Sequence, residues 1–454
     1  MSTPAVAPDL QELAVRIVRE SLGRGASAAE CVVRSSRELS VTVRLGETES
    51  VKQAEGKALG IRVFRGQQAG TVYSSDLSWS AVEPMIASAL AIAENASSDP
   101  FAGLPAPEEQ GSAAADLELY SERAAAVTPD QAIAWAREAE RAALDCDPRL
   151  GNSDGGSFDA GESTRILANS NGFLGAVRGS SCSLAAVPIA TQDGKMQRDY
   201  WYTVARSPEE LESPASVGRT AARRTLRRLG ARKIPTTKVP VVFDPQAARS
   251  LLGHLLEAVS GEAVYREASF LKGKLGELVA APEFTLVDDG LRPRGLGSSP
   301  FDAEGVPSRR TVVINEGRLH SYLLNCYAAR KLGLRTTGNA ARGLAGAPGV
   351  SCGNLTLQPG TATPEEIIAS VPRGLYVTEF IGFGVNLVTG DYSRGASGLW
   401  IENGELAYPV EEITLAGNLA EMFRNVRAIG SDLVYRGAVT SPTLLIEGLT
   451  LAGS

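Results

Sequence analysis

The sequence predicts an α+β protein of two domains that divide near residue 235. The chain has 454 residues, more than one ordinary hydrophobic core holds, so two domains are expected. In residues 1–235, segments with helical spacing of apolar residues alternate with strand-like segments, which favours an α/β-type domain with helices on a mixed or antiparallel sheet. In residues 236–454, successive strand-like segments are joined by glycine turns, which favours a β-rich, barrel-like domain.

The composition indicates a globular protein without membrane spans and without a general affinity for nucleic acid. Hydrophobic residues make up 43% of the chain, yet no run of about 18 uncharged apolar residues occurs. The formal net charge of −7 does not attract nucleic acid, so such a partner is not expected. The segment Met1–Leu10 has no basic region before an apolar core, so we expect no secretory signal and a cytoplasmic location.

Histidine and cysteine are too sparse to predict a metal centre built by this chain alone. Catalytic zinc usually takes two or three imidazoles, and the chain has only His254 and His320. The cysteines lie far apart and form no C-x-x-C pair, so neither a disulfide framework nor a zinc knuckle is indicated. These five residues are Cys31, Cys146, Cys182, Cys326 and Cys352.

The first half of the chain is expected to contain three helices and two groups of strands. Apolar spacing predicts helices over residues 10–22, 80–95 and 129–144, with an exposed loop at 99–116. Residues 41–45 predict a strand, and 59–64 and 70–74 predict a hairpin. An antiparallel meander is expected over residues 164–205, with turns at 171–172 and 193–194.

An arginine-rich helix is predicted over residues 208–229, before a linker at 233–238. Its glutamates come first and its arginines last, an order that complements the helix dipole. We therefore interpret the arginines as a solvated helix face rather than as a phosphate-binding site. The residues are Glu209, Glu210 and Glu212, then Arg223, Arg224, Arg227 and Arg228.

The second half begins with a strand over residues 239–243 and then a helix. Asp244 is the expected N-cap and Pro245 the first helical residue. Five apolar residues at helical spacing predict a buried stripe, with Ser250, His254 and Glu257 on the opposite side. The stripe consists of Ala248, Leu251, Leu252, Leu255 and Val259.

The remainder of the second half is predicted to be mostly strands. A long glycine-rich loop at 336–353 interrupts them, and loops of this length are often functional. Asn418 is the expected cap of a late helix, with Glu421 at its third position. The predicted strands are residues 284–288, 310–315, 319–324, 375–380, 383–401, 406–410 and 443–451.

Several sequence segments resemble the TldD/PmbA family of metalloproteases, and within it the PmbA (TldE) branch. The resemblance covers most of the chain, and the three segments nearest the C-terminus are the most specific. The segments are 301–308 (FDAEGVPS), 315–317 (NEG), 386–395 (NLVTGDYSRG), 400–405 (WIENGE) and 409–419 (PVEEITLAGNL).

The resemblance implies a protease helix that has lost its metal ligands. The TldD branch binds zinc through His-Glu-x-x-x-His and a cysteine near the C-terminus. Position by position, Leu256 and Gly261 replace the histidines, only Glu257 keeps its type, and residues 432–442 contain no cysteine. Leucine and glycine donate nothing to zinc, so we expect no catalytic residue and no metal in this chain.

The implied function is that of a metal-free PmbA/TldE-type subunit of a heteromeric zinc metalloprotease. Such an assembly would degrade or process unfolded peptides and small proteins, with zinc in a TldD-type partner and no activity in this chain alone. One alternative is a self-contained peptidase that acts as a homodimer through Glu257, His254 or Cys352. Another is a binding protein that modulates DNA gyrase through the arginine helix at 219–233.

One polar segment is the candidate for substrate or partner contact. It comprises Asp391, Tyr392, Ser393 and Arg394. A plain β-turn, stabilised by its aspartate and serine side chains, explains the same residues equally well.

Overall fold

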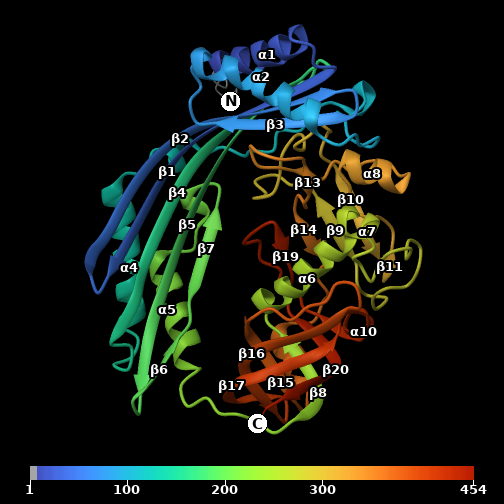
Figure 1. Ribbon diagram of the computed structural model, residues 1–454. Helices are drawn as coiled ribbons and strands as arrows, with labels where there is room; N and C mark the ends of the chain where they lie inside the picture. The colour runs from blue at the N-terminus through green and yellow to red at the C-terminus, as the bar shows by residue number, and fades with distance from the viewer. Residues whose placement is uncertain (1–7, 454) are drawn as a thin grey trace.

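The computed structural model describes residues 8–453, which form a long curved sheet beside a β-rich body (Figure 1). Residues 1–7, which carry most of the segment used to predict the absence of a secretory signal, lie outside the described residues. The α+β prediction is confirmed, because helices cover a sheet in the first part and a closed barrel forms the second. Within residues 8–453, no helix is both long and apolar enough to cross a membrane.

The first part is built on a sheet whose strands all pair antiparallel, in the order β3-β2-β1-β4-β5-β6, with β7 also on β5. The hairpin and the meander are therefore confirmed. The strands at its centre are much longer than predicted, because polar residues in mid-sheet interrupt the apolar alternation without ending the strand. The strands are β1 (Ala28–Arg44), β2 (Glu47–Arg65), β3 (Gln68–Ser74), β4 (Asn152–Asn169), β5 (Leu174–Gln192), β6 (Lys195–Arg198) and β7 (Trp201–Ala205).

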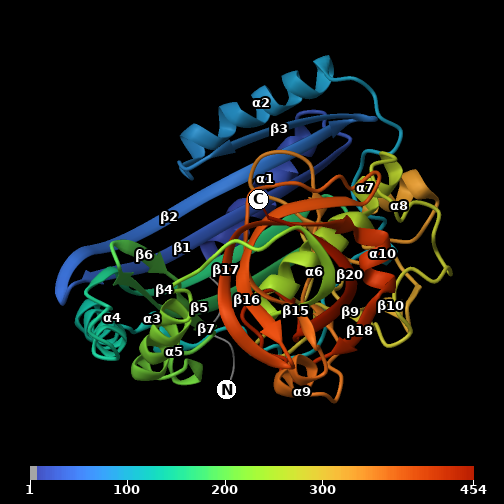
Figure 2. The same ribbon diagram turned by 90° about the horizontal axis from the view of Figure 1, so that it is seen from below.

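Two pairs of helices cover one face of this sheet at its two ends (Figure 2). On β1, Cys31 and Val33 face α1 and α2, whereas Leu39 and Val41 face α4 and α5. All four have odd numbers, so they lie on the same side of the strand. The helices are α1 (Pro8–Gly23), α2 (Trp79–Asn95), α3 (Glu122–Ala125), α4 (Pro129–Leu144) and α5 (Pro214–Leu226), with short 3₁₀ turns η1 (Pro107–Glu109) and η2 (Pro208–Glu210).

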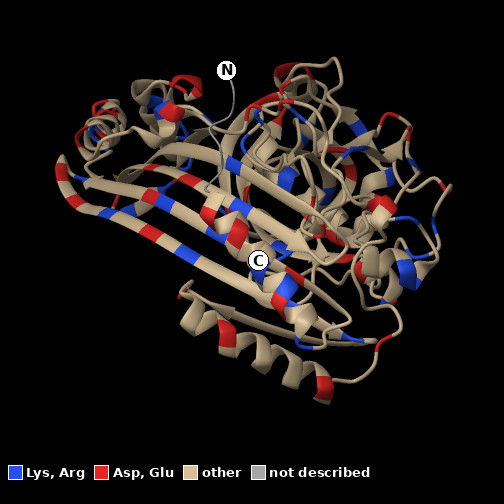
Figure 3. Cartoon of the chain, turned by 90° about the horizontal axis from the view of Figure 1, so that it is seen from above, with Lys and Arg blue, Asp and Glu red and all other residues tan. Residues whose placement is uncertain are grey.

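The outer edge of β2 is free over residues 47–58, because β3 pairs only with residues 59–65. Acidic and basic residues are interspersed along the long strands of the sheet (Figure 3). On the free edge they include Glu49, Lys52, Glu55 and Lys57. Charged side chains on an exposed edge oppose pairing with another strand, so this edge is protected against self-association.

The second part contains a barrel of five strands, in which β8 and β15 run parallel and β17 pairs with β20 to close the ring. Strand β18 extends it beside β20. The barrel encloses the largest hydrophobic core of the protein. Its strands are β8 (Thr237–Phe243), β15 (Arg373–Ile381), β16 (Asp391–Glu402), β17 (Glu405–Asn418), β18 (Val426–Ile429) and β20 (Leu444–Ala452).

A smaller sheet, ordered β11-β10-β9-β14-β19, joins the barrel to the N-terminal sheet. The glycine-rich loop at 336–353, expected to lack regular structure, contains the short paired strands β12 (Ala340–Ala341) and β13 (Gly349–Val350). The small sheet comprises β9 (Leu286–Asp289), β10 (Arg310–Asn315), β11 (Arg318–Leu319), β14 (Leu355–Leu357) and β19 (Val439–Thr440). The remaining helices are α6 (Pro245–Val259), α7 (Gly261–Tyr265), α8 (Cys326–Leu332), α9 (Pro364–Ala369) and α10 (Leu419–Arg424).

The arginine-rich helix differs from its prediction in both extent and role. It begins at Pro214, so Glu209 and Glu210 lie in the preceding 3₁₀ turn and not in its first turn. Its arginines are not a solvated face, because three of the four, Arg224, Arg227 and Arg228, contact groups of the second part. Arg224 pairs with Asp199 and Asp244, at 3.2 Å each.

Two further arginines of this segment also cross the interface between the two parts. Arg228 forms an ion pair of 2.6 Å with Glu379 of β15. Arg227 lies 6.0 Å from the ring centre of Tyr376, where burial lowers its pKa. The prediction failed because the dipole argument considers the helix alone, whereas tertiary contacts brought carboxylates to its arginines.

A second group of buried charges joins the two parts at the other end of the interface. Glu30 of β1 pairs with Arg62 of β2 at 3.1 Å, and with Arg342 from the glycine-rich loop. Beside it, Phe301 packs with Val32 and Leu167 on the sheet face opposite the helices. Ion pairs and apolar contacts therefore fix the second part against the sheet at both ends.

We predict that Arg224→Ala destabilises the protein by about 3–5 kcal/mol, because it leaves two buried carboxylates without their counter-charge. Equilibrium unfolding in urea measures this change. Arg223→Ala is the matched control, because Arg223 is exposed on the same helix, and its effect is expected to stay within about 0.5 kcal/mol. Equal effects of the two substitutions would contradict the assigned role of Arg224.

Candidate degenerate protease site

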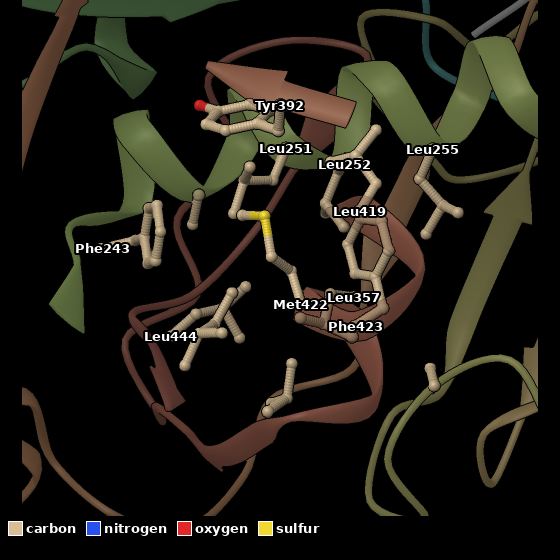
Figure 4. Close-up of a cluster of buried hydrophobic side chains, with 14 of the residues drawn as sticks. Phe243, Leu251, Leu252, Leu255, Leu357, Tyr392, Leu419, Met422, Phe423 and Leu444 are labelled. Carbon is tan, nitrogen blue, oxygen red and sulfur yellow. The ribbon is translucent and has the colours of Figure 1, made fainter. Parts of the chain in front are cut away.

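Helix α6 forms as the sequence predicts, directly after strand β8. The carboxylate of Asp244 accepts a 2.9 Å hydrogen bond from the backbone N–H of Ala247, which caps the helix. The expected apolar stripe is confirmed as buried. Leu251, Leu252 and Leu255 point into the same core as Leu419, Met422 and Phe423 of α10 (Figure 4).

The motif segment is not one continuous helix. Helix α6 ends at Val259, Ser260 is extended, and α7 begins at Gly261. Leu323 runs beside this break: its N–H donates to the Val259 carbonyl (2.9 Å), and its carbonyl accepts from the Gly261 N–H (2.8 Å). Leu256 and Gly261, which replace the two histidines, therefore lie on different helices.

Close packing leaves no room for a side chain at Gly261. A Cβ atom there would lie 2.3 Å from Cδ2 of Leu324 and 2.9 Å from Cβ of Ala328. Leu256 packs half-buried against the barrel core, and Glu257 is exposed. These three positions supply no pair of imidazoles and no space for one, so they do not fit a zinc ion.

The two histidines of the chain have different surroundings. His320 is exposed after β11. His254 is half-buried on α6, and its ring meets the ring of Tyr392 edge to face at 6.0 Å. Burial, and then the positive charge of Arg394, lower the pKa of His254 and favour its neutral form. Among residues 8–453, no three His, Cys, Asp or Glu residues are grouped so as to hold a metal ion.

The polar segment 391–394 lies against the polar side of α6, a contact that the sequence did not predict. The Arg394 guanidinium donates a 2.7 Å hydrogen bond to the Ser250 hydroxyl and lies 4.9 Å from the centre of the Phe380 ring. Tyr392 is buried, and its hydroxyl finds no hydrogen-bond partner among the described residues. These two side chains attach the start of β16 to the degenerate helix.

The other two residues of this segment are exposed at the start of strand β16, where they pair with β17. Asp391 is exposed and accepts hydrogen bonds from the Thr389 hydroxyl (2.6 Å) and the Asn418 amide (3.3 Å). Ser393 is exposed, and its N–H donates to the carbonyl of Gly384. The interpretation of the segment as a plain β-turn is therefore wrong, because its four residues pair with β17, and its contact with substrate or partner stays a prediction.

An exposed apolar loop precedes this segment, where the sequence suggested a continuous strand. Strand β16 begins only at Asp391, and residues 382–390 form a loop. Ile381, Phe383 and Val388 are 60%, 107% and 57% exposed. Gly382 and Gly390, both at positive φ, mark the loop ends and are the signal that sequence reasoning missed.

Cys326 and Cys352, the two cysteines of the second part, are poorly suited to nucleophilic catalysis because both thiols are largely buried. Cys326 is fully buried, and burial raises the pKa of its thiol well above the usual range. Burial raises the pKa of Cys352 to about 12. Because the thiolate is the nucleophile, both groups are inactive at neutral pH.

The architecture is that of a class of metallopeptidases made of three sequence domains. Residues 29–93, 122–229 and 236–453 match domain 1, the central domain and the C-terminal domain of the PmbA/TldA metallopeptidases. The first two of these sequence domains share the single long sheet.

The chain belongs to the PmbA/TldD family, which confirms the resemblance seen in its sequence. It is 40% identical to Metalloprotease PmbA of Escherichia coli O157:H7, over 97% of this chain and 96% of that protein. It is 38% identical to a PmbA homolog of Haemophilus influenzae, over 100% and 99% of the two chains.

Solved structures share this fold over nearly the whole chain. A candidate modulator of DNA gyrase from Bacteroides thetaiotaomicron aligns with a TM-score of 0.92 at 28% identity, over 99% of this chain and 100% of that one. TldE from Thermococcus kodakarensis aligns with a TM-score of 0.88 at 22% identity, over 97% and 100% of the two chains. The second likeness supports the fold alone.

We predict that restoring the histidines does not restore zinc binding. Gly261→His forces a side chain into the contact with Leu324 and Ala328, and is expected to cost at least about 1–3 kcal/mol of folding free energy. Urea unfolding measures this cost, with Glu257→His as the exposed control in the same segment. A Leu256→His/Gly261→His variant that holds one zinc per chain, by elemental analysis, at unchanged stability would refute the packing argument.

Proposed function

We propose that this chain is the non-catalytic, PmbA/TldE-type subunit of a heteromeric zinc metalloprotease in the cytoplasm. In this proposal a TldD-type partner carries the zinc, and the assembly degrades or processes unfolded peptides and small proteins. The observation that carries the proposal is the packing of Gly261, which leaves no space for the second zinc ligand. Membership of a metalloprotease family supports a role in proteolysis. The packing at Gly261 supports the proposal that another chain binds the metal.

The similarity to other members of the family supports a partner of the TldD type. The chain is 34% identical, over 46% of its length, to a TldD homolog of Haemophilus influenzae, an organism that also has a PmbA homolog. Two related chains in one cell are the requirement for a heteromeric assembly.

The exposed loop with Ile381, Phe383 and Val388 is the proposed contact with the partner. Clustered exposed apolar side chains mark interaction sites more often than scattered ones do. The loop leads directly into the segment 391–394, which is attached to α6 through Arg394 and Ser250. A partner that binds this loop would therefore be positioned beside the degenerate helix.

The alternative functions receive less support. As a DNA-binding surface, residues 219–233 offer few free cations, because Arg224, Arg227 and Arg228 are engaged at the interface. Of the exposed basic residues, Arg232 lies over the Tyr408 ring and Lys233 pairs with Glu412, which leaves Arg219 and Arg223. As a self-contained peptidase, the chain would rely on thiols that burial keeps protonated and on an exposed Glu257 without a metal-bound water.

We predict that the purified chain alone holds no stoichiometric zinc and cleaves no unfolded peptide. Co-expressed with a TldD-type chain from the same organism, it is expected to co-purify in a complex that contains zinc and cleaves the peptide in a chelator-sensitive way. Elemental analysis and a fluorogenic casein assay measure both properties. Chelator-sensitive cleavage by the isolated chain with one zinc bound would overturn the proposal.

We further predict that Phe383→Asp weakens association with the partner at least tenfold and leaves the stability of the isolated chain unchanged. The Phe383 ring is fully exposed, so its removal is not expected to change the folding free energy of the isolated chain, and it weakens association only if an interface covers the ring. Tyr73→Asp is the control, because Tyr73 is 65% exposed on β3, away from the loop. Sedimentation of the co-purified complex measures the association, and equal effects of both substitutions would exclude this loop as the contact.

A further inference from the structure

A cavity of about 450 Å³ lies between the N-terminal sheet and the second part, beside α7, the short helix that begins at Gly261. Its walls come from the β2–β3 hairpin and the loop after α2 on one side, and from α7 and the start of α8 on the other. Small-molecule sites commonly have volumes of roughly 300–1,000 Å³ and often lie between domains. The cavity therefore has the size and position of a ligand site.

Glu304 is the buried charged group of this cavity that lacks a counter-charge. It is 3% exposed and lines the cavity, and one carboxylate oxygen accepts the backbone N–H of Cys326 at 2.8 Å. Within residues 8–453, none of the ion pairs includes Glu304, because Arg62 and Arg342 both pair with Glu30 instead. A buried carboxylate without a cation is costly, and a bound cation would remove that cost.

The surroundings of Glu304 disfavour its ionised form as long as no cation lies beside it. Burial and the neighbouring carboxylate of Asp302 raise its pKa to about 7, and Glu30 adds to this effect. The Asp302 carboxylate, in contrast, accepts three hydrogen bonds of 2.8–3.0 Å, from the backbone N–H groups of Glu304, Val306 and Ala340. Among these acidic groups, Glu304 is the one whose carboxylate lines the cavity.

The remaining walls suit a ligand with an ammonium group at one end and peptide groups beyond it. Tyr265 and Tyr327 form an aromatic wall, with ring centres 5.6 Å apart in an edge-to-face arrangement. Aromatic faces attract cations, and tyrosines also contact apolar side chains. Arg266, which is exposed and pairs with Glu262 at 2.9 Å, adds N–H groups that can donate to carbonyl or carboxylate oxygens. The Asn325 amide also lines the cavity, but its NH2 group already donates to the carbonyls of Pro348 and Gly349.

We propose that this cavity binds a primary ammonium group through Glu304, and that its occupant is the amino-terminal end of a short peptide. The recognition of an ammonium group rests on the cavity alone. The choice of a peptide over another primary amine rests on the proposed function. The cavity would then hold peptide ends in the subunit that carries no zinc.

The test is a calorimetric titration of the isolated chain with the tripeptide Ala-Ala-Ala at pH 7. We expect saturable binding of one peptide per chain, weakened at least tenfold when the peptide is N-acetylated. Glu304→Gln is expected to weaken binding of Ala-Ala-Ala at least tenfold. Glu283→Gln, which changes an exposed carboxylate outside the cavity, is the control and is expected to bind as the wild type does.

A second measurement needs no substitution. At pH 6 the carboxyl of Glu304 is largely protonated and the peptide amine is charged, so binding of the ammonium group is expected to release up to one proton. At pH 8.5 Glu304 is already ionised, whereas the peptide amine, with an ordinary pKa of about 8, is largely neutral, so binding is expected to take up a proton instead. Titrations in buffers of different ionisation enthalpy measure this release and this uptake. Equal binding of free and acetylated peptide, no release at pH 6, or no binding by the folded wild type would each overturn the assignment.

The source of the amine is tested with 1,4-diaminobutane. Binding of the tripeptide at least tenfold tighter than the diamine supports a peptide end, whereas tighter binding of the diamine overturns it. Failure of this site would leave zinc and activity in the co-expressed complex unchanged. Failure of the proposed function would leave the titration of the isolated chain unchanged, so the two proposals are separable.

Discussion

The carboxylate of Asp244 is the point on which the arrangement of the two parts depends. It caps helix α6 through the N–H of Ala247 and pairs with Arg224 of α5 from the first part. Both groups are buried, so neither can be exchanged for water without a large cost in free energy. The same carboxylate therefore caps α6 through one oxygen and, through the other, fixes the helix relative to the long sheet.

Helix α6 is fixed on one side by the barrel core and on the other by the start of β16. Its apolar stripe packs into the barrel core, which accounts for the retention of the helix after the loss of ligands. The site of the second ligand is occupied by contacts with Leu324 and Ala328, and the chain turns at Ser260 before reaching it. The polar side of the helix has instead become an attachment point for Arg394 and Tyr392.

Buried charges serve two different ends in this protein. Arg224, Arg228 and Arg342 each meet a carboxylate, and these pairs hold the first and second parts together. Glu304 lies close to Glu30 of one of these groups, and it forms no ion pair with any residue in the described range 8–453. The paired arginines therefore stabilise the fold, whereas Glu304 is proposed to form its ion pair with a ligand.

The sequence by itself determined the local elements and the family. Helical spacing, the Asp244-Pro245 cap and the glycine turns depend on neighbours within a few residues, so α4, α6 and the meander followed from the chain alone. Only the tertiary structure decided the length of β1 and β2, the burial of the arginines, the exposure of Phe383 and the isolation of Glu304. Each of these depends on groups distant in the sequence, and no local pattern specifies which groups the fold brings together.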